Sequence, residues 1–168
     1  MGLDPRERPL TEGVQTYNAC ASYFLANLIE WFYSKERADM CLKIAEKAEE
    51  LQDLSSMPII NRHFYYQNLI RFYYKLRDRD GMLEKVVQLC RSAIAIAPQA
   101  ASEFRRDKAF GNQLPSHVAY EQLAIIEKKR KNWEEVIKIC ESAKKQKWAG
   151  NWDSRILEAK SRLEKDAK

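Results

Sequence analysis

Residues 63–80 contain the side chains best suited to binding chemistry. Their sequence, HFYYQNLIRFYYKLRDRD, intersperses aromatic rings with three arginines and a lysine. Aromatic rings can stack on nucleic-acid bases while arginines hold phosphates, but rings at helical spacing are also typical of a buried helix face. Whether this stretch binds nucleic acid or forms a buried helix face depends on the helices predicted around it.

Metal and catalytic chemistry have little support in the sequence. The two histidines lie far apart in the chain, and no two of the four cysteines form a C-x-x-C pair, so we expect no metal site. There is no glycine-rich phosphate loop and no nucleophile elbow, so we expect a non-enzymatic protein without a cofactor. The four cysteines are Cys20, Cys41, Cys90 and Cys140. Because no secretory signal is present, we expect them to be reduced thiols in the cytoplasm.

The net charge of +5 comes from the last quarter of the chain. Residues 1–126 hold 16 basic and 16 acidic side chains, and residues 127–168 hold 13 basic and 8 acidic ones. Such an excess can mark an anionic partner, but lysines interspersed with glutamates more often form a solvated helix face. No apolar run approaches the roughly 20 residues that a membrane span requires, so we expect no membrane partner.

Composition favours helices, because glycine and proline are scarce, with five of each in 168 residues. Residues 1–13 lack apolar periodicity and are expected to be a flexible segment, followed by a single helical domain over residues 14–168. Apolar residues at three- and four-residue steps predict three helix pairs and a last, mostly polar helix.

Several residues are predicted to mark where these helices begin and end. Pro98 is predicted to end the fourth helix, and residues 99–115 to form a long irregular linker. Residues predicted to cap the last three helices, with Glu135 completing a capping box for the second of them, are Ser116, Asn132 and Asp153.

The three predicted pairs share a template. In the first helix a large residue, a leucine and a small or branched residue come before an aromatic, at Leu25, Leu28, Ile29 and Phe32, then Tyr66, Leu69, Ile70 and Tyr73, then Tyr120, Leu123, Ala124 and Glu127. The second helix carries three small residues, at Cys41, Ala45 and Ala48, then Val86, Cys90 and Ala93, then Val136, Cys140 and Ala143. This pattern, over about residues 22–148, resembles the tetratricopeptide repeat, although Glu127 stands where an aromatic is usual.

The resemblance implies an all-α fold, a right-handed α-solenoid of about three antiparallel helical hairpins with a C-terminal capping helix. It also implies a concave groove, lined by the first helices, that binds a peptide or helix of another protein. The core would take Tyr66 and Tyr73, and the cysteines of the second helices would serve as packing groups. The carboxylate clamp of some family members is absent, because Ala26, Glu30, Val118 and Gln122 occupy its outer positions.

The groove residues that the resemblance implies come from all three hairpins. They are Tyr23, Asn27, Glu30 and Tyr33 in the first hairpin, Phe64, Gln67, Asn68, Arg71, Tyr74 and Lys75 in the second, and Val118, Glu121, Gln122, Ile125, Lys128 and Lys129 in the third.

Nucleic-acid binding is the alternative hypothesis. It would use the basic last quarter and six basic side chains, Arg71, Arg77, Arg79, Arg105, Arg106 and Lys108. Acidic residues interleave with these side chains and would repel phosphates, at Asp78, Asp80, Glu103 and Asp107. A protein or peptide partner is therefore the favoured expectation.

Overall fold

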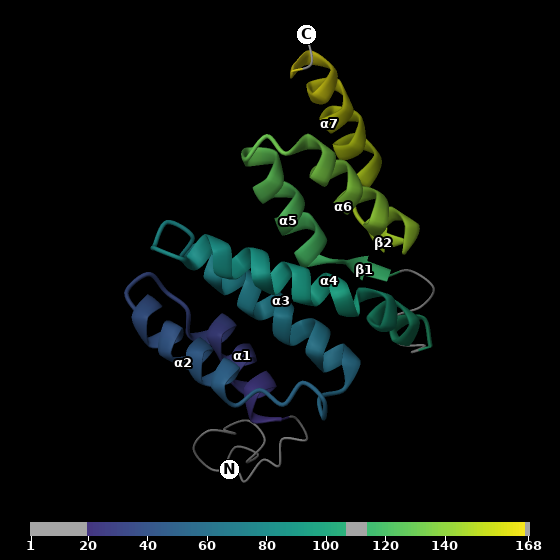
Figure 1. The fold of residues 1–168 in the computed structure, drawn as a ribbon. Coiled ribbons are helices and arrows are strands. Elements are labelled where there is room, and N and C mark those ends of the chain that lie inside the picture. Colours follow the sequence, from purple (N-terminus) through teal and green to yellow (C-terminus); the bar gives the residue numbers. More distant parts are fainter. Residues whose placement is uncertain (1–19, 107–113, 167–168) are drawn as a thin grey trace, which may run out of the picture.

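The computed structural model describes residues 20–106 and 114–166 (Figure 1), and over these ranges it is helical apart from two short strands. In chain order the elements are α1 (Ala21–Phe32), α2 (Ala38–Glu50), α3 (Ile59–Lys75), α4 (Met82–Arg106), β1 (Leu114–Ser116), α5 (Val118–Lys129), α6 (Trp133–Lys145), β2 (Trp148–Ala149) and α7 (Trp152–Asp166). The predicted all-α class is confirmed for these residues, with a minor strand pair added. The predicted flexible segment, residues 1–13, lies outside them.

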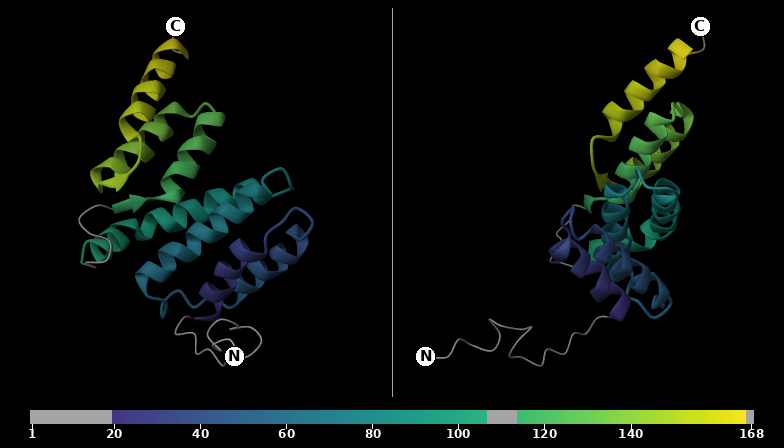
Figure 2. Two further views of the ribbon diagram at one scale, coloured as in Figure 1. Left: turned by 180° about the vertical axis from the view of Figure 1, so that it is seen from behind. Right: turned by 90° about the vertical axis from the view of Figure 1, so that its left-hand side faces the viewer.

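Successive helices pack as pairs. Helix α1 lies against α2, α3 against α4 and α5 against α6, while α7 lies along α6. The pairs touch through α1 and α3, through α3 and α5, and through α4 and α5. Figure 2 shows from two further sides that the pairs follow one another in chain order. No described helix is long and apolar enough to cross a membrane.

Helix α3 is the central helix of the fold, because it packs against α1, α4 and α5. The four side chains predicted to form its core stripe are all buried, which confirms that prediction: Tyr66, Leu69, Ile70 and Tyr73. Four further side chains that the template did not place in the core are buried as well: His63, Tyr65, Asn68 and Phe72. Residues 63–75 therefore serve mainly as core, since neighbouring helices cover α3 on more than one side.

The cysteines of the second helices are fully buried among small side chains, as predicted for packing groups. They are Cys41, Cys90 and Cys140. Burial raises the pKa of Cys90 to about 12 and the pKa of Cys140 to about 11. Both thiols are therefore protonated at neutral pH.

Helix α4 does not end at Pro98, which corrects the predicted helix end. It continues to Arg106, with Pro98 inside it on the exposed side. A proline inside a helix removes a hydrogen bond and costs about 3 kcal/mol. The extra two turns compensate by burying Ala100, Ala101 and Phe104, each at 1% exposure or less. Residues 99–106 of the predicted linker therefore belong to α4.

The predicted caps also differ from the structure. Asn132 does precede α6, but it makes no side-chain cap hydrogen bond, so the capping box with Glu135 is not formed. Ser116 belongs to β1, and His117 is the residue before α5. Asp153 lies within the first turn of α7 rather than ahead of it. The first correction has a local cause, because the Asn132 amide donates to Glu127 in the same turn, and the second has a tertiary cause, because β1 pairs with β2.

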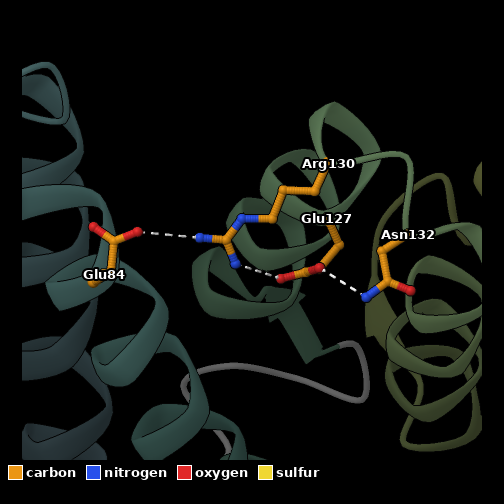
Figure 3. A network of polar contacts seen from close by, with 4 residues as sticks. All are labelled: Glu84, Glu127, Arg130 and Asn132. Carbon is orange, nitrogen blue, oxygen red and sulfur yellow. Dashed lines mark hydrogen bonds and ion pairs between the residues drawn. The ribbon is translucent and has the colours of Figure 1, made fainter.

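Glu127 closes the turn between α5 and α6 with polar contacts instead of the aromatic packing typical of the repeat (Figure 3). Its buried carboxylate accepts hydrogen bonds from Arg130 Nη1 and Asn132 Nδ2, both at 3.1 Å. Arg130 Nη2 also reaches Glu84 of α4, at 3.5 Å. The turn itself needs the left-handed backbone of Lys131, whose φ is 58°. These contacts tie the third helix pair to the second.

Strands β1 and β2 pair in parallel, with Leu114 opposite Trp148. Next to them lies an aromatic cluster that joins α3, α4, α5 and β2, made of His63, Phe64, Phe104, His117, Tyr120 and Trp148. The cluster brings the two histidines together, with ring centroids 4.8 Å apart. Phe104, placed in the linker by the sequence pattern, is a core residue of α4.

Candidate functional site

A hollow of about 250 Å³ opens between α1, α3 and α5, and we call it the α1–α3–α5 hollow. Its floor is apolar and its walls are polar or charged. The lining residues are Ile29, Glu30, Asn68, Arg71, Phe72, Tyr74, Lys75 and Gln122. Six of these eight, all but Ile29 and Phe72, were predicted as groove residues from the sequence.

Two polar contacts join α1 to α3 at this hollow. Asn68 Nδ2 donates to Asn27 Oδ1 at 2.7 Å. Arg71 Nη1 lies 3.3 Å from Glu30 Oε1, and both of these side chains are about half exposed. In the amide pair Asn68 is buried and Asn27 is half-buried, whereas the ion pair lies at the rim, where solvent weakens it.

Two tyrosines carry cations at or beside the hollow: Tyr74 lines it, and Tyr33 lies next to its lining residue Lys75. Lys75 Nζ lies 4.1 Å from the ring centroid of Tyr33. Lys129 Nζ donates to Tyr74 Oη at 3.3 Å. Gln122 Nε2 is buried and has no hydrogen-bond partner among the described residues. The hollow therefore presents ring surface, cations and an unused amide donor.

Two further hollows lie along α5, which also lines the first. One of about 220 Å³, between the ends of α3 and α5, is lined by Tyr74, Arg77, Asp78, Leu83, Ile126, Lys129 and Arg130. The other, of about 500 Å³ between α5 and α7, is called the α5–α7 hollow; its lining residues are Ile125, Lys128, Lys129, Lys131, Trp133, Arg155, Glu158 and Arg162. Tyr74 belongs to the first two hollows and Lys129 to the second and third, so each hollow shares a lining residue with the next.

Some predicted groove residues lie elsewhere. Phe64 packs in the aromatic cluster, with its ring centroid 5.3 Å from that of His63 and 6.0 Å from that of Phe104, instead of facing the groove. The other predicted residues that line none of the three hollows are Tyr23, Asn27, Tyr33, Gln67, Val118 and Glu121. Helical periodicity shows that these side chains lie on one face of their helix. It does not show whether a neighbouring helix covers the N-terminal half of that face.

Sequence reasoning missed the contribution of α7. Arg155, Glu158 and Arg162 line the α5–α7 hollow, opposite Lys128 and the predicted groove face of α5. Their i, i+3 and i+7 spacing on one helix face, together with the basic excess of residues 127–168, is the signal that was available.

The arginines of the nucleic-acid hypothesis are engaged within the protein. Arg79 pairs with Asp39 at 2.6 Å, and Arg105 donates to the backbone oxygen of Gln146 at 2.6 Å. Arg71, Arg77 and Arg106 likewise bond to Glu30, to the Tyr74 carbonyl and to Glu103. Lys108 lies outside the described residues.

The buried histidines are neutral groups. Burial lowers the pKa of His63 to about 4 and the pKa of His117 to about 3. Neither His63 Nε2 nor either ring nitrogen of His117 has a hydrogen-bond partner among the described residues. No group of three or more histidine, cysteine or carboxylate side chains in that part of the chain could hold a metal ion.

Comparison with protein-family models, with curated proteins and with solved structures finds no match to this chain.

Proposed function

We propose that this chain is a non-enzymatic protein-interaction module that holds a peptide or helix of a partner protein across α1, α3 and α5. The observation that carries the proposal is the α1–α3–α5 hollow, where three helices contribute rings, amides and charges of both signs to one open surface. Peptide ligands need this mixture, because they present backbone polar groups and varied side chains together.

The proposal treats the three helix pairs as a divergent, right-handed tetratricopeptide-like solenoid with α7 as its capping helix. Support comes from the packing order, in which the first helices of successive pairs touch, α1 with α3 and α3 with α5. In a stack of this kind a partner can cross several first helices at once.

Each kind of side chain in the hollow has a role toward a peptide. Tyr74 offers ring area, which is favoured at interaction hot spots. Gln122 lines the hollow, and its amide Nε2, buried without a hydrogen-bond partner among the described residues, would donate to a backbone carbonyl once the side chain turns toward the ligand. Arg71 and Lys75, both exposed at the rim, can exchange their internal contacts for carboxylates of the partner. The ion pair of Arg71 with Glu30 is weak enough in solvent to be exchanged in this way.

The test places a photo-crosslinking amino acid at position 75 and, as a control, at position 138 on α6, outside the three hollows. Nuclease-treated lysate of the native host is irradiated with each protein, and crosslinked proteins are identified by mass spectrometry. We expect a protein that is captured at position 75 only. Arg71→Ala/Tyr74→Ala should abolish its capture, and Gln88→Ala/Arg91→Ala, exposed on α4, should leave it unchanged.

Two results would contradict the proposal. Equal capture at both positions would show non-specific contact. Loss of every captured protein after nuclease treatment, with nucleic acid bound to the untreated sample, would make the nucleic-acid alternative the better account.

A further inference from the structure

We infer that the α5–α7 hollow receives an acidic segment of the partner, whose carboxylates are held by Arg155, Arg162 and Lys131. The inference rests on the proposed function and adds the chemistry of the ligand at one end of the binding face. It concerns a surface that the groove residues predicted from the sequence reach only through Ile125, Lys128 and Lys129.

The lining of this hollow is strongly unbalanced in charge. Five of its eight lining residues are lysine or arginine and one is a carboxylate, Glu158. A hydrogen bond from Lys128, followed by the charges of Lys128, Arg162 and Arg155, lowers the pKa of Glu158. The single carboxylate therefore stays ionised, yet it cannot balance the cations around it.

The cations of the hollow differ in whether they already have a partner. Lys128 Nζ lies 2.6 Å from Glu158 Oε1, and Lys129 donates to Tyr74 at 3.3 Å. Within the described ranges 20–106 and 114–166, the side chains of Lys131, Arg155 and Arg162 make no hydrogen bond and no ion pair, in contrast to the arginines of α3 and the end of α4. Three unpaired cations at one open hollow are the groups available for an anion.

The chemistry of these groups favours carboxylates beside an apolar residue. A guanidinium binds a carboxylate through two parallel N–H donors. Trp133 and Ile125 supply the apolar part of the lining, and the indole N–H of Trp133 donates to Asp166 at 2.8 Å, which fixes the ring. An acidic residue next to a hydrophobic one would satisfy both parts of the hollow.

A peptide fits the surroundings better than a nucleic acid does. The excess of positive charge is largest at this hollow, where five cations face one carboxylate, whereas Asp78 stands among three cations in the next hollow and Glu30 beside two in the one beyond it. A phosphate backbone would meet those carboxylates, whereas a peptide can place acidic residues at the α5–α7 end and other residues farther along the face.

The probe for the experiment is a fluorescein-labelled ten-residue peptide of alternating glutamate and leucine, with glutamine replacing glutamate in the control peptide. Binding is measured by fluorescence anisotropy at low and high salt. We expect Arg155→Ala/Arg162→Ala to weaken binding of the acidic peptide about tenfold or more, because two charge-assisted contacts are lost. Arg91→Ala/Lys138→Ala, which removes the same charge from another part of the surface, should change it less than about twofold, in line with screening of distant charges.

Circular dichroism and thermal melting verify that each variant folds. If Arg155→Ala/Arg162→Ala does not fold, the exposed substitution Arg162→Glu takes its place and should weaken binding by at least as much as removing that one contact, about threefold or more.

Several outcomes would overturn the inference. These are no preference for the glutamate peptide over the glutamine peptide, an equal loss in Arg91→Ala/Lys138→Ala, and tighter binding of a labelled ten-nucleotide thymidine strand. Complete displacement of the peptide by inorganic phosphate at low concentration would assign the hollow to a small phosphate ligand instead. Failure of this inference is separable from failure of the proposed function, because capture at position 75 does not require the two arginines of α7.

Discussion

Tyr73 and Tyr74 are neighbours in the chain but have different surroundings. Tyr73 is 2% exposed, and its hydroxyl donates to Glu49 Oε2 at 2.7 Å. Burial is the main cause that raises the pKa of Tyr73 above its ordinary value, and the hydrogen bond to Glu49 adds to it. Tyr74 is half-buried at the edge of two hollows. The first ring is part of the core and the second is part of the candidate binding face.

Truncating these two rings should therefore have different effects on stability. We expect Tyr73→Ala to lower the free energy of unfolding by about 3–5 kcal/mol, as for other buried aromatic residues. Tyr73→Phe, which removes only the hydroxyl, should cost about 1 kcal/mol. Chemical denaturation measures both, with Tyr74→Ala as the control that loses less than Tyr73→Ala. Equal losses for the two alanine variants would refute the core assignment of Tyr73.

Helix α4 illustrates how an element can tolerate a residue that its own local preferences exclude. Pro98 lies well inside the helix and is exposed to solvent. The residues on either side of it contribute buried alanines, Ala97 and Ala100 with Ala101. Packing of this stripe against the rest of the core outweighs the local cost of the proline.

Replacing this proline should stabilise the protein. Pro98→Ala restores a backbone N–H to the helix and relieves the clash with the preceding turn, which offers up to about 3 kcal/mol. The unfolded chain gains conformational entropy when the proline is removed, which reduces this gain in the free energy of unfolding by about 0.4–1 kcal/mol. We therefore expect the free energy of unfolding to rise by about 1–2 kcal/mol in urea denaturation, and Gln99→Ala, on the same exposed side, serves as the control. A loss of stability would mean that the proline has a structural role that the helix geometry does not account for.

The molecule as a whole depends on the aromatic cluster, where the second helix pair meets the third. His63 comes from α3 and is 3% exposed, and His117 precedes α5 and is 1% exposed. Trp148 of β2 lies against both, stacked on His63 and edge-on to His117. His63 lies 54 positions before His117 and 85 positions before Trp148 in the chain, so the cluster joins distant parts of the sequence. The cluster thus couples protonation of its histidines to the joining of the helix pairs.

Mild acid should loosen this junction. The ordinary pKa of histidine is 6.5, whereas the folded protein holds His63 at about 4 and His117 at about 3. Between pH 6.5 and 4 the unfolded chain binds protons that the folded chain does not, so the free energy of unfolding falls as the pH falls. From pH 7 to pH 5 we expect a loss of about 2–4 kcal/mol for the pair.

Urea denaturation at a series of pH values measures this loss. The variant His63→Phe/His117→Phe should lose most of the dependence between pH 7 and 5, because its remaining acidic groups titrate mainly below pH 5. An unchanged slope in that variant would assign the acid sensitivity to other groups.

The sequence by itself determined the helical class, the buried stripe of α3, the packing role of the cysteines and much of the candidate site. These properties follow from spacing along one helix, which local periodicity records directly. Six predicted groove residues share one hollow for this reason, since they lie on successive turns of first helices.

Only the tertiary structure decided the rest, because it depends on which helices become neighbours. Local periodicity assigns one buried stripe to a helix, but α3 has three neighbouring helices, so Phe64 packs in the aromatic cluster although the pattern had placed it in the groove. The meeting of His63 with His117 and the placing of Arg155 and Arg162 opposite α5 join residues far apart in the chain. Such contacts are set by long-range packing. Packing is also the reason that α4 continues past Pro98, where the local preference of proline is to end a helix.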